Sequence, residues 1–126
     1  MISRIATLVL LTCFATAAAA GSVEQWLRKL DPEERARQTC ILKGLKEVQR
    51  NVRLAKADRM QSSILSKASL NGDMLVANGG AVRVKGRWYA LSFECNLTTD
   101  RMAAKNFAFK LGAEIPKQKW DDFGLW

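Results

Sequence analysis

The carboxylates are the side chains through which this chain could most readily catalyse a reaction, because its sequence contains no histidine. Without histidine, a serine or cysteine nucleophile lacks its usual general base, and no Ser-x-x-Lys spacing offers a lysine instead. Glu94 with Asp100, or Asp121 with Asp122, would suit general acid–base work if folding brought each pair together in a cleft. The alternative is that these residues are solvated charges beside lysines and arginines.

Metal and cofactor sites are not indicated. With no histidine and widely spaced cysteines, the chain falls short of a tetrahedral zinc set. Gly79-Gly80 lacks the Gly-Lys-Ser/Thr ending of a phosphate-binding loop. We therefore predict no metal and no cofactor. A non-enzymatic protein is the favoured interpretation, and a small carboxylate-dependent enzyme acting on an envelope or extracellular substrate is the alternative.

The first twenty residues follow the order of a secretory signal peptide. Arg4 gives a positive start, Ile5–Phe14 is an apolar run, and Ala18-Ala19-Ala20 supplies a small-residue cleavage site. We therefore predict that residues 1–20 are removed and that residues 21–126 work in the periplasm or outside the cell. After that cleavage, no remaining segment is apolar for long enough to span a membrane.

The predicted compartment determines how the cysteines are interpreted. Cys13 leaves with the signal peptide, and Cys40 and Cys95 remain as an even pair, which in an oxidising compartment is typical of one disulfide. Two separate buried thiols are the alternative, and a redox role is disfavoured because redox enzymes use close pairs such as Cys-x-x-Cys. A lipoprotein attached through Cys13 is a further alternative, although Thr12 is not the small residue usual before such a cysteine.

The chain is basic, with 20 Lys and Arg residues against 12 Asp and Glu residues. Loss of Arg4 with the signal peptide leaves 19 basic residues and a net charge of +7. We predict an anionic envelope component (a lipid head group or a polysaccharide) or a protein as partner, and no nucleic acid. The candidate anion-contact residues are Lys43, Lys46, Arg50 and Arg53 on a predicted helix, and Arg83, Lys85 and Arg87 on a predicted hairpin. The alternative is an ordinary charged surface that keeps the protein soluble.

Aromatic residues form a second candidate surface. Its members are Trp88, Tyr89, Trp120, Phe123 and Trp126. Together they would suit an apolar ligand or a docking partner. The alternative, favoured for large aromatic side chains, is that they pack in the core.

A helix is predicted from Asp31 to about Val52. Asp31 suits the N-cap, Pro32 suits the first helical position, and Glu34 completes an Asp-x-x-Glu capping box. At the helical period, the apolar face consists of Ile41, Leu45, Val48 and Val52. The preceding segment, Ser22–Leu30, has apolar residues at the same period, which predicts a short helix or an arm docked on the main body.

Gly44 needs a structural reason, because glycine is a poor helix former and the predicted helix contains this one in its interior. It lies beside Cys40 on the flank of the apolar face. We hypothesise that Gly44 lets the helix approach a β-sheet closely.

The clearest strand pattern is a hairpin over Val82–Leu97, with Gly86 in its tight turn. Alternation directs Trp88 to one face of the second strand and Cys95 to the other. The residues predicted to share the face of Cys95 are Tyr89, Leu91, Phe93 and Leu97.

Other elements are shorter. Asn71-Gly72-Asp73 and Asn78-Gly79-Gly80 are predicted turns on either side of a short strand, Met74–Ala77. Between Asp58 and Leu65, helix and strand fit the pattern equally well. A last strand is predicted around Lys105–Leu111, with a bulge or an end at Gly112.

Together these elements predict an α+β fold, in which an N-terminal amphipathic helix packs on a small antiparallel sheet. Cys40 on the helix flank and Cys95 on the apolar strand face have the orientation that one helix-to-sheet disulfide needs. Because no repeat or low-complexity linker interrupts residues 21–126, we predict a single domain.

Several of these segments together resemble the DUF930 family, which comprises exported bacterial proteins of unknown function. The segments are Lys85–Cys95, Leu30-Asp31-Pro32 followed by Cys40, Asn78-Gly79-Gly80-Ala81, and Gly112–Pro116 followed by Trp120. The resemblance covers nearly all of residues 29–126. It implies an exported α+β module with paired cysteines. It implies no activity and no catalytic residue, since the family has none assigned.

Overall fold

A computed structural model describes residues 18–126 of the chain. The α-helices are α1 (Ala18–Lys29) and α2 (Pro32–Gln49), and the strands are β1 (Ala57–Gln61), β2 (Ser69–Asn71), β3 (Met74–Val84), β4 (Arg87–Leu97) and β5 (Ala104–Glu114). Short 3-10 turns are η1 (Val52–Leu54), η2 (Lys117–Lys119) and η3 (Asp121–Phe123). The predicted signal peptide lies outside the described residues except for Ala18–Ala20, which begin α1, so its removal stays a prediction.

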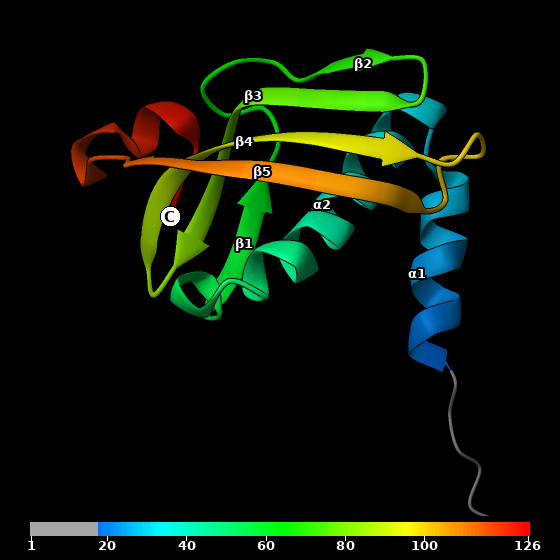
Figure 1. The fold of residues 1–126 in the computed structure, drawn as a ribbon, viewed down its shortest axis with the longest axis horizontal. Helices are drawn as coiled ribbons and strands as arrows, with labels where there is room; N and C mark the ends of the chain where they lie inside the picture. The colour runs from blue at the N-terminus through cyan, green and yellow to red at the C-terminus, as the bar shows by residue number, and fades with distance from the viewer. Residues whose placement is uncertain (1–17) are drawn as a thin grey trace, which may run out of the picture.

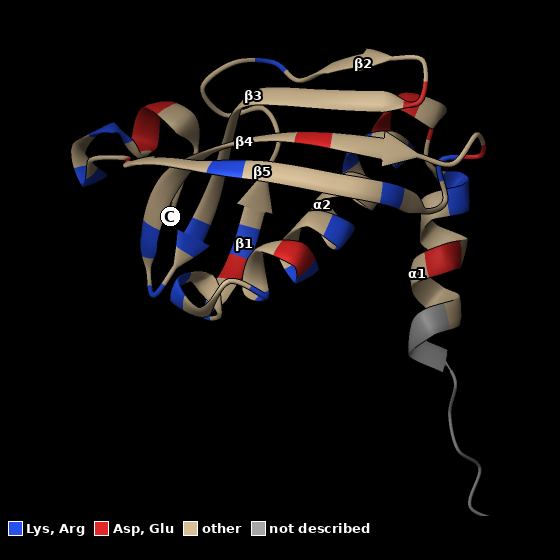
Figure 2. Cartoon of the chain, viewed as in Figure 1, with Lys and Arg blue, Asp and Glu red and all other residues tan. Residues whose placement is uncertain are grey.

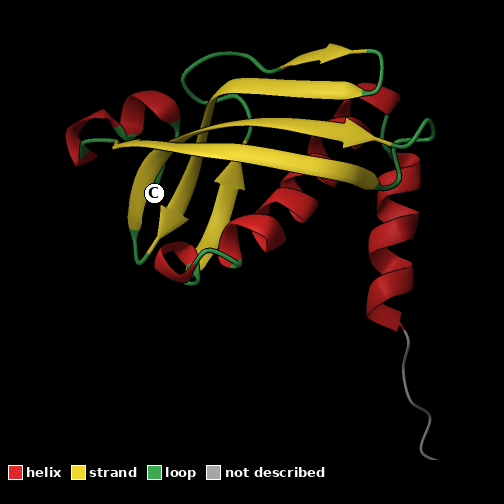
Figure 3. Ribbon diagram, in the orientation of Figure 1, coloured by secondary structure: helices red, strands yellow, loops and turns green. Residues whose placement is uncertain are grey.

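The strands form one antiparallel sheet in the order β1-β3-β4-β5, with β2 also paired to β3. α2 lies across one face of this sheet and contacts β1, β3, β4 and β5 (Figure 1, Figure 3). α1 contacts α2 and projects beyond the edge of the sheet. The predicted α+β fold is confirmed, and the segment Ser22–Leu30, predicted to be a short helix or a docked arm, belongs to the helix α1 except for its last residue.

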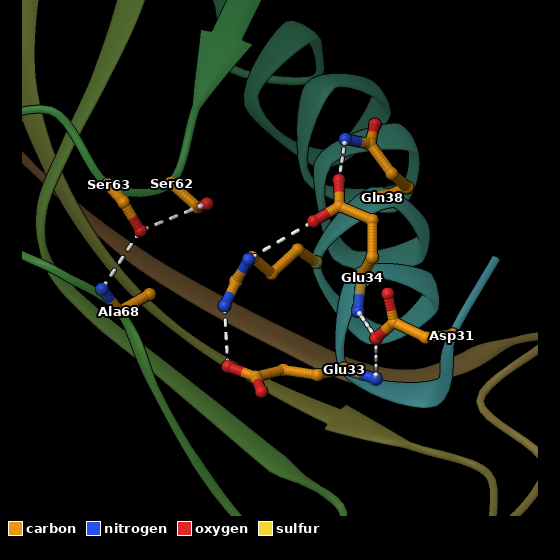
Figure 4. A network of polar contacts seen from close by, with 8 residues as sticks. Asp31, Glu33, Glu34, Gln38, Ser62, Ser63 and Ala68 are labelled. Carbon is orange, nitrogen blue, oxygen red and sulfur yellow. Dashed lines mark hydrogen bonds and ion pairs between the residues drawn. The ribbon is translucent and has the colours of Figure 1, made fainter.

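The start of α2 follows from its first residues. The Asp31 side chain accepts hydrogen bonds from the backbone N–H groups of Glu33 and Glu34, each at 3.1 Å (Figure 4). Pro32 occupies the first turn, where its missing N–H costs nothing. The predicted N-cap at Asp31 is therefore confirmed.

The end and the buried face of α2 differ from the prediction. The helix ends at Gln49, because the Asn51 side chain accepts a hydrogen bond from the N–H of Arg53 and starts η1 instead. Val52, predicted to be apolar core, is 91% exposed. The fully buried row consists of Ala36, Cys40, Gly44 and Val48, while Ile41 and Leu45 are half-buried. A row of mostly small residues lets the helix lie close to the sheet.

Gly44 is the position of closest approach. A β-carbon built there would lie 2.6 Å from Cζ of Phe107 on β5, and closer still to Cε of Met60 on β1. Ordinary carbon contacts are near 3.5–4 Å, so the hypothesis of a close approach to the sheet is confirmed.

Gly44→Leu is therefore expected to lower the free energy of unfolding by about 1–3 kcal/mol, because the larger side chain must displace Met60 and Phe107. Thermal and denaturant unfolding measure this loss. Lys46→Leu, at an exposed position of the same helix, is the matched control. Equal melting temperatures for wild type and Gly44→Leu would contradict the close approach.

The β3–β4 hairpin has the predicted tight turn. Lys85 and Gly86 both have positive φ values, 52° and 74°, between the paired residues Val84 and Arg87. Two central residues with positive φ characterise the type I′ turn, which suits the twist of a hairpin. The predicted alternation is confirmed as well: the four residues from Leu91 to Leu97 on the face of Cys95 are buried, and Trp88 points to the opposite face.

The predicted turn at Asn78-Gly79-Gly80 is wrong, because these residues form a bulge within the single strand β3. Ala77 pairs with Phe93 and Gly80 with Leu91, so two residues of β3, Asn78 and Gly79, oppose one residue of β4. A β-carbon on Gly79 would overlap the backbone of Ser66. Position 79 must therefore be glycine, because the loop that contains Ser66 crosses the bulge at this point.

The remaining strands also extend the predicted pattern. The ambiguous segment from Asp58 to Leu65 is strand β1 followed by a loop. β5 runs to Glu114, and a register shift places a bulge at the predicted position, Gly112. The Gly72-Asp73 turn joins β2 to β3 as predicted.

The sheet carries a smaller apolar cluster on the face opposite α2. Its buried members are Ala81, Trp88, Ile115 and Leu125, with Ile64, Trp120 and Phe123 packed against them. The tail after β5, which contains η2 and η3, folds back over this face (Figure 1). The sheet is therefore covered on one side by a helix and, over part of the other side, by the tail.

Candidate anion-binding site

The disulfide joins α2 to β4. The Cα atoms of Cys40 and Cys95 lie 6.0 Å apart, within the range that an unstrained backbone allows, and both residues are fully buried. Neither sulfur is placed to meet a substrate. The pair therefore holds the helix on the sheet rather than taking part in redox chemistry.

The predicted basic residues of α2 have carboxylate partners nearby. Lys43 Nζ lies 3.0 Å from one oxygen of Glu47, and Arg50 Nη1 lies 3.7 Å from the other. The hydrogen bond from Lys43, together with the charges of Arg50 and Lys43, lowers the pKa of Glu47. Lys46 is exposed and has no carboxylate partner among residues 18–126. The Glu47 carboxylate thus partly offsets the positive charge of the basic residues on α2.

Arg83 of β3 is occupied by structural contacts. Its Nε and Nη2 donate to the two carboxylate oxygens of Asp58 at 2.9 and 2.7 Å, and Nη1 donates to the backbone oxygen of Trp126 at 3.0 Å. The hydrogen bond from Arg83 holds the pKa of Asp58 below its ordinary value. Arg83 therefore ties β1 and the tail to β3 and is not free for a ligand.

Arg53, Lys85 and Arg87 lie together at one end of the molecule, and we call these three residues the basic tip. With Val84 and Tyr89 they line a depression of about 450 Å³. Arg53 comes from η1, Lys85 lies in the hairpin turn and Arg87 directly follows that turn; Lys and Arg residues are blue in Figure 2. Two loops that are distant in the sequence thus present their cations to the same volume.

Backbone pairing holds these two loops together. Ala57, at the start of β1, pairs with Val84, at the end of β3, so the segment after η1 is fixed beside the hairpin turn. Arg53 is held in η1 by the hydrogen bond from its N–H to the Asn51 side chain, 3.0 Å long. The basic tip is therefore built on hydrogen-bonded turns and not on a loose loop.

The lining of the basic tip has three cationic residues and no acidic residue. Arg87 Nε is 3.8 Å from Glu114, and both side chains are largely exposed, which makes a weak pair. Within the described part of the chain, Arg53 and Lys85 have no carboxylate partner. A larger hollow of about 640 Å³ beside the start of α2 is lined by charges of both signs, Asp31, Glu33, Lys67 and Arg101.

Residues 27–125 match the family described as a Domain of Unknown Function, DUF930. The chain belongs to the DUF930 family. The expected resemblance is thereby confirmed over both cysteines, the basic tip and the tail. Comparison with curated proteins and with solved structures gave no match.

Membership of DUF930 assigns no activity, so chemistry must be judged from the side chains. Asp100 accepts hydrogen bonds from the N–H of Met102 at 3.0 Å and from the hydroxyl of Thr98 at 2.7 Å. These bonds lower the pKa of Asp100, the opposite of what a general acid requires. Asp121 and Asp122 are exposed in η3. Residues 18–126 contain no cluster of three or more His, Cys, Asp and Glu side chains that would hold a metal ion.

The five aromatic residues are divided between two faces of the DUF930 sheet. Trp88 is fully buried, and Trp120 and Phe123 pack in the same cluster. Trp126 is 60% exposed, with the guanidinium of Arg59 lying 4.3 Å from its ring centre. Tyr89 points to the other face, packs against the main core and borders the basic tip.

The sequence alone missed two exposed residues that lie close to Arg53 along the chain. Val52 was placed in the core, and Lys56, which is exposed between η1 and β1, was not singled out. The signal that could have found Val52 is Asn51, a residue that favours caps and turns over helix interiors. Nothing in the spacing of Lys56 distinguishes it from other surface lysines.

Proposed function

We propose that this DUF930 protein is exported and acts, without catalysis, as a binding or structural accessory of the bacterial envelope. In this proposal the basic tip contacts an anionic envelope component. The contact is electrostatic, and the disulfide keeps the scaffold that presents the tip rigid.

Export is supported by two observations, the order of the first twenty residues and the disulfide. Residues 1–20 have the order of a signal peptide. The Cys40–Cys95 disulfide suits an oxidising compartment, such as the periplasm or the exterior. Among the helices of residues 18–126, none has the length and apolar character needed to cross a bilayer.

The observation that carries the binding proposal is the convergence of Arg53, Lys85 and Arg87 on one depression whose lining has no acidic residue. Cations gathered around a hollow reinforce one another's potential and raise the local concentration of anions. Tyr89 adds a hydroxyl at the same place. On α2, by contrast, Glu47 offsets the neighbouring cations, so the basic tip is the better candidate for binding an anion.

Arg53→Glu combined with Lys85→Glu is expected to weaken binding to anionic probes at least about 30-fold at low ionic strength. Each basic residue near an anionic surface contributes about 1 kcal/mol, and charge reversal adds repulsion. The measurement uses the purified protein in the form that the cell accumulates, with phosphatidylglycerol vesicles and dextran sulfate as probes.

A control with the same change in net charge is Lys105→Glu combined with Lys110→Glu, two exposed positions of β5. Binding of the wild type should also fall as salt rises, because exposed charges are screened. Equal weakening by both double variants would mean that net charge, and not the basic tip, governs binding. No binding of the wild type to either probe at low ionic strength would overturn the proposed function.

A further inference from the structure

Val52 is the most exposed of the large apolar residues in the described part of the chain, at 91%. It precedes Arg53 directly and lies on η1, which forms one side of the basic tip. Exposed Arg50 and Lys56 flank the same turn in the sequence. The exposed side chain of Val52 thus lies on a turn whose sequence neighbours include three cationic residues.

The turn that presents Val52 is firmly built. The backbone N–H of Leu54 donates to the oxygen of Asn51 at 2.9 Å, and the N–H of Asn51 donates to the oxygen of Val48 at 3.0 Å. Leu54 is 5% exposed and belongs to the main core. With Leu54 anchored inward, Val52 is directed outward by the backbone and not by fraying of a helix end.

We propose that the anionic partner of the basic tip is the surface of a lipid bilayer, with Arg53, Lys85 and Arg87 on the phosphate head groups and Val52 inserted among the upper acyl chains. This inference rests on the proposed function and names its partner. The protein would lie on the membrane at this end and would not cross it.

The combination of residues favours a bilayer over a soluble polyanion. A sulfated or phosphorylated polysaccharide offers anions to the tip but no apolar environment for an aliphatic side chain. An anionic bilayer offers both in the order required, because its charged head groups overlie the boundary of the acyl chains. Val52 directly precedes Arg53 in η1, and the pairing of Ala57 with Val84 holds the segment after η1 beside the hairpin that carries Lys85 and Arg87.

Substitutions of Val52 separate a bilayer from a polysaccharide, since they leave every charge in place. Val52→Ala is expected to weaken binding to vesicles of phosphatidylglycerol and phosphatidylcholine about tenfold, and Val52→Leu to strengthen it about threefold. Neither variant should change binding to dextran sulfate. Leu111→Ala, at an exposed apolar position on β5, is the matched control and should leave vesicle binding unchanged.

Each outcome has a defined meaning. If Val52→Ala and Val52→Leu bind vesicles as the wild type does, membrane insertion is refuted while the proposed function stands. If the wild type binds dextran sulfate but not vesicles, the partner is a polysaccharide, which also refutes the lipid inference alone. Binding to neither probe refutes both proposals.

Discussion

Replacement of Cys95 by serine is expected to lower the free energy of unfolding by about 4 kcal/mol. The disulfide to Cys40 spans 55 residues, and a cross-link over a loop of that length restricts the unfolded chain by about this amount in the chain-entropy model. Small domains are stable by only about 5–15 kcal/mol. The variant should therefore melt far below the wild type in thermal unfolding followed by circular dichroism.

Two controls separate the cross-link from side-chain packing. The wild type with a thiol reductant should melt close to the Cys95→Ser variant, because it has lost the same covalent bond. Cys40→Ala combined with Cys95→Ala removes both sulfurs and avoids burying a lone hydroxyl or a free thiol at these fully buried positions. If reductant leaves the melting temperature of the wild type unchanged under conditions that reduce the bond, the disulfide does not have the stabilising role argued for it.

The elements that the sequence predicted well are those whose backbone hydrogen bonds and φ values are determined by their own residues. Asp31 and Pro32 cap α2 through contacts within four residues, and the turn at Lys85-Gly86 needs only their own positive φ values. The alternation along β4 correctly placed Cys95 on the face of the main core, because successive residues of a strand point to opposite faces of the sheet.

The elements that the sequence did not predict depend on a distant neighbour. Gly79 looked like a turn residue, but its oxygen accepts hydrogen bonds from the N–H groups of Ile64 and Leu65, at 2.8 and 2.7 Å. Only the folded chain shows that this loop crosses β3 there. A glycine needed for close approach and a glycine needed for a turn are identical in sequence.

The basic tip illustrates the same limit for function. Arg53 was grouped with the helix and Lys85 with the hairpin, and both assignments to the surface agree with their exposure. Their convergence depends on the pairing of Ala57 with Val84, which charge spacing does not reveal. The sequence thus predicted which side chains carry charge, and the register of β1 on β3 determines which of them lie together.

Trp88→Ala is expected to lower the free energy of unfolding by about 3–5 kcal/mol, the usual cost of emptying a fully buried tryptophan site. Trp88 lies under the tail, and its Nε1–H donates to the backbone oxygen of Trp126 at 3.0 Å. Its loss would remove both the apolar contact with Ile115 and Leu125 and the hydrogen bond that fastens the tail. Denaturant unfolding measures the change.

Trp88→Phe divides this loss into its two parts. Phenylalanine keeps most of the apolar contact but has no N–H donor, and the oxygen of Trp126 still accepts from Arg83 at 3.0 Å. The cost of this variant should therefore be nearer to that of one hydrogen bond, about 1 kcal/mol, together with a small cavity. Trp26→Ala, which removes a 45% exposed tryptophan of α1, is the matched control and should cost little. If Trp88→Ala is no more destabilising than Trp26→Ala, the tail cluster adds nothing to stability, and the main core and its disulfide alone must hold the hairpin that presents the basic tip.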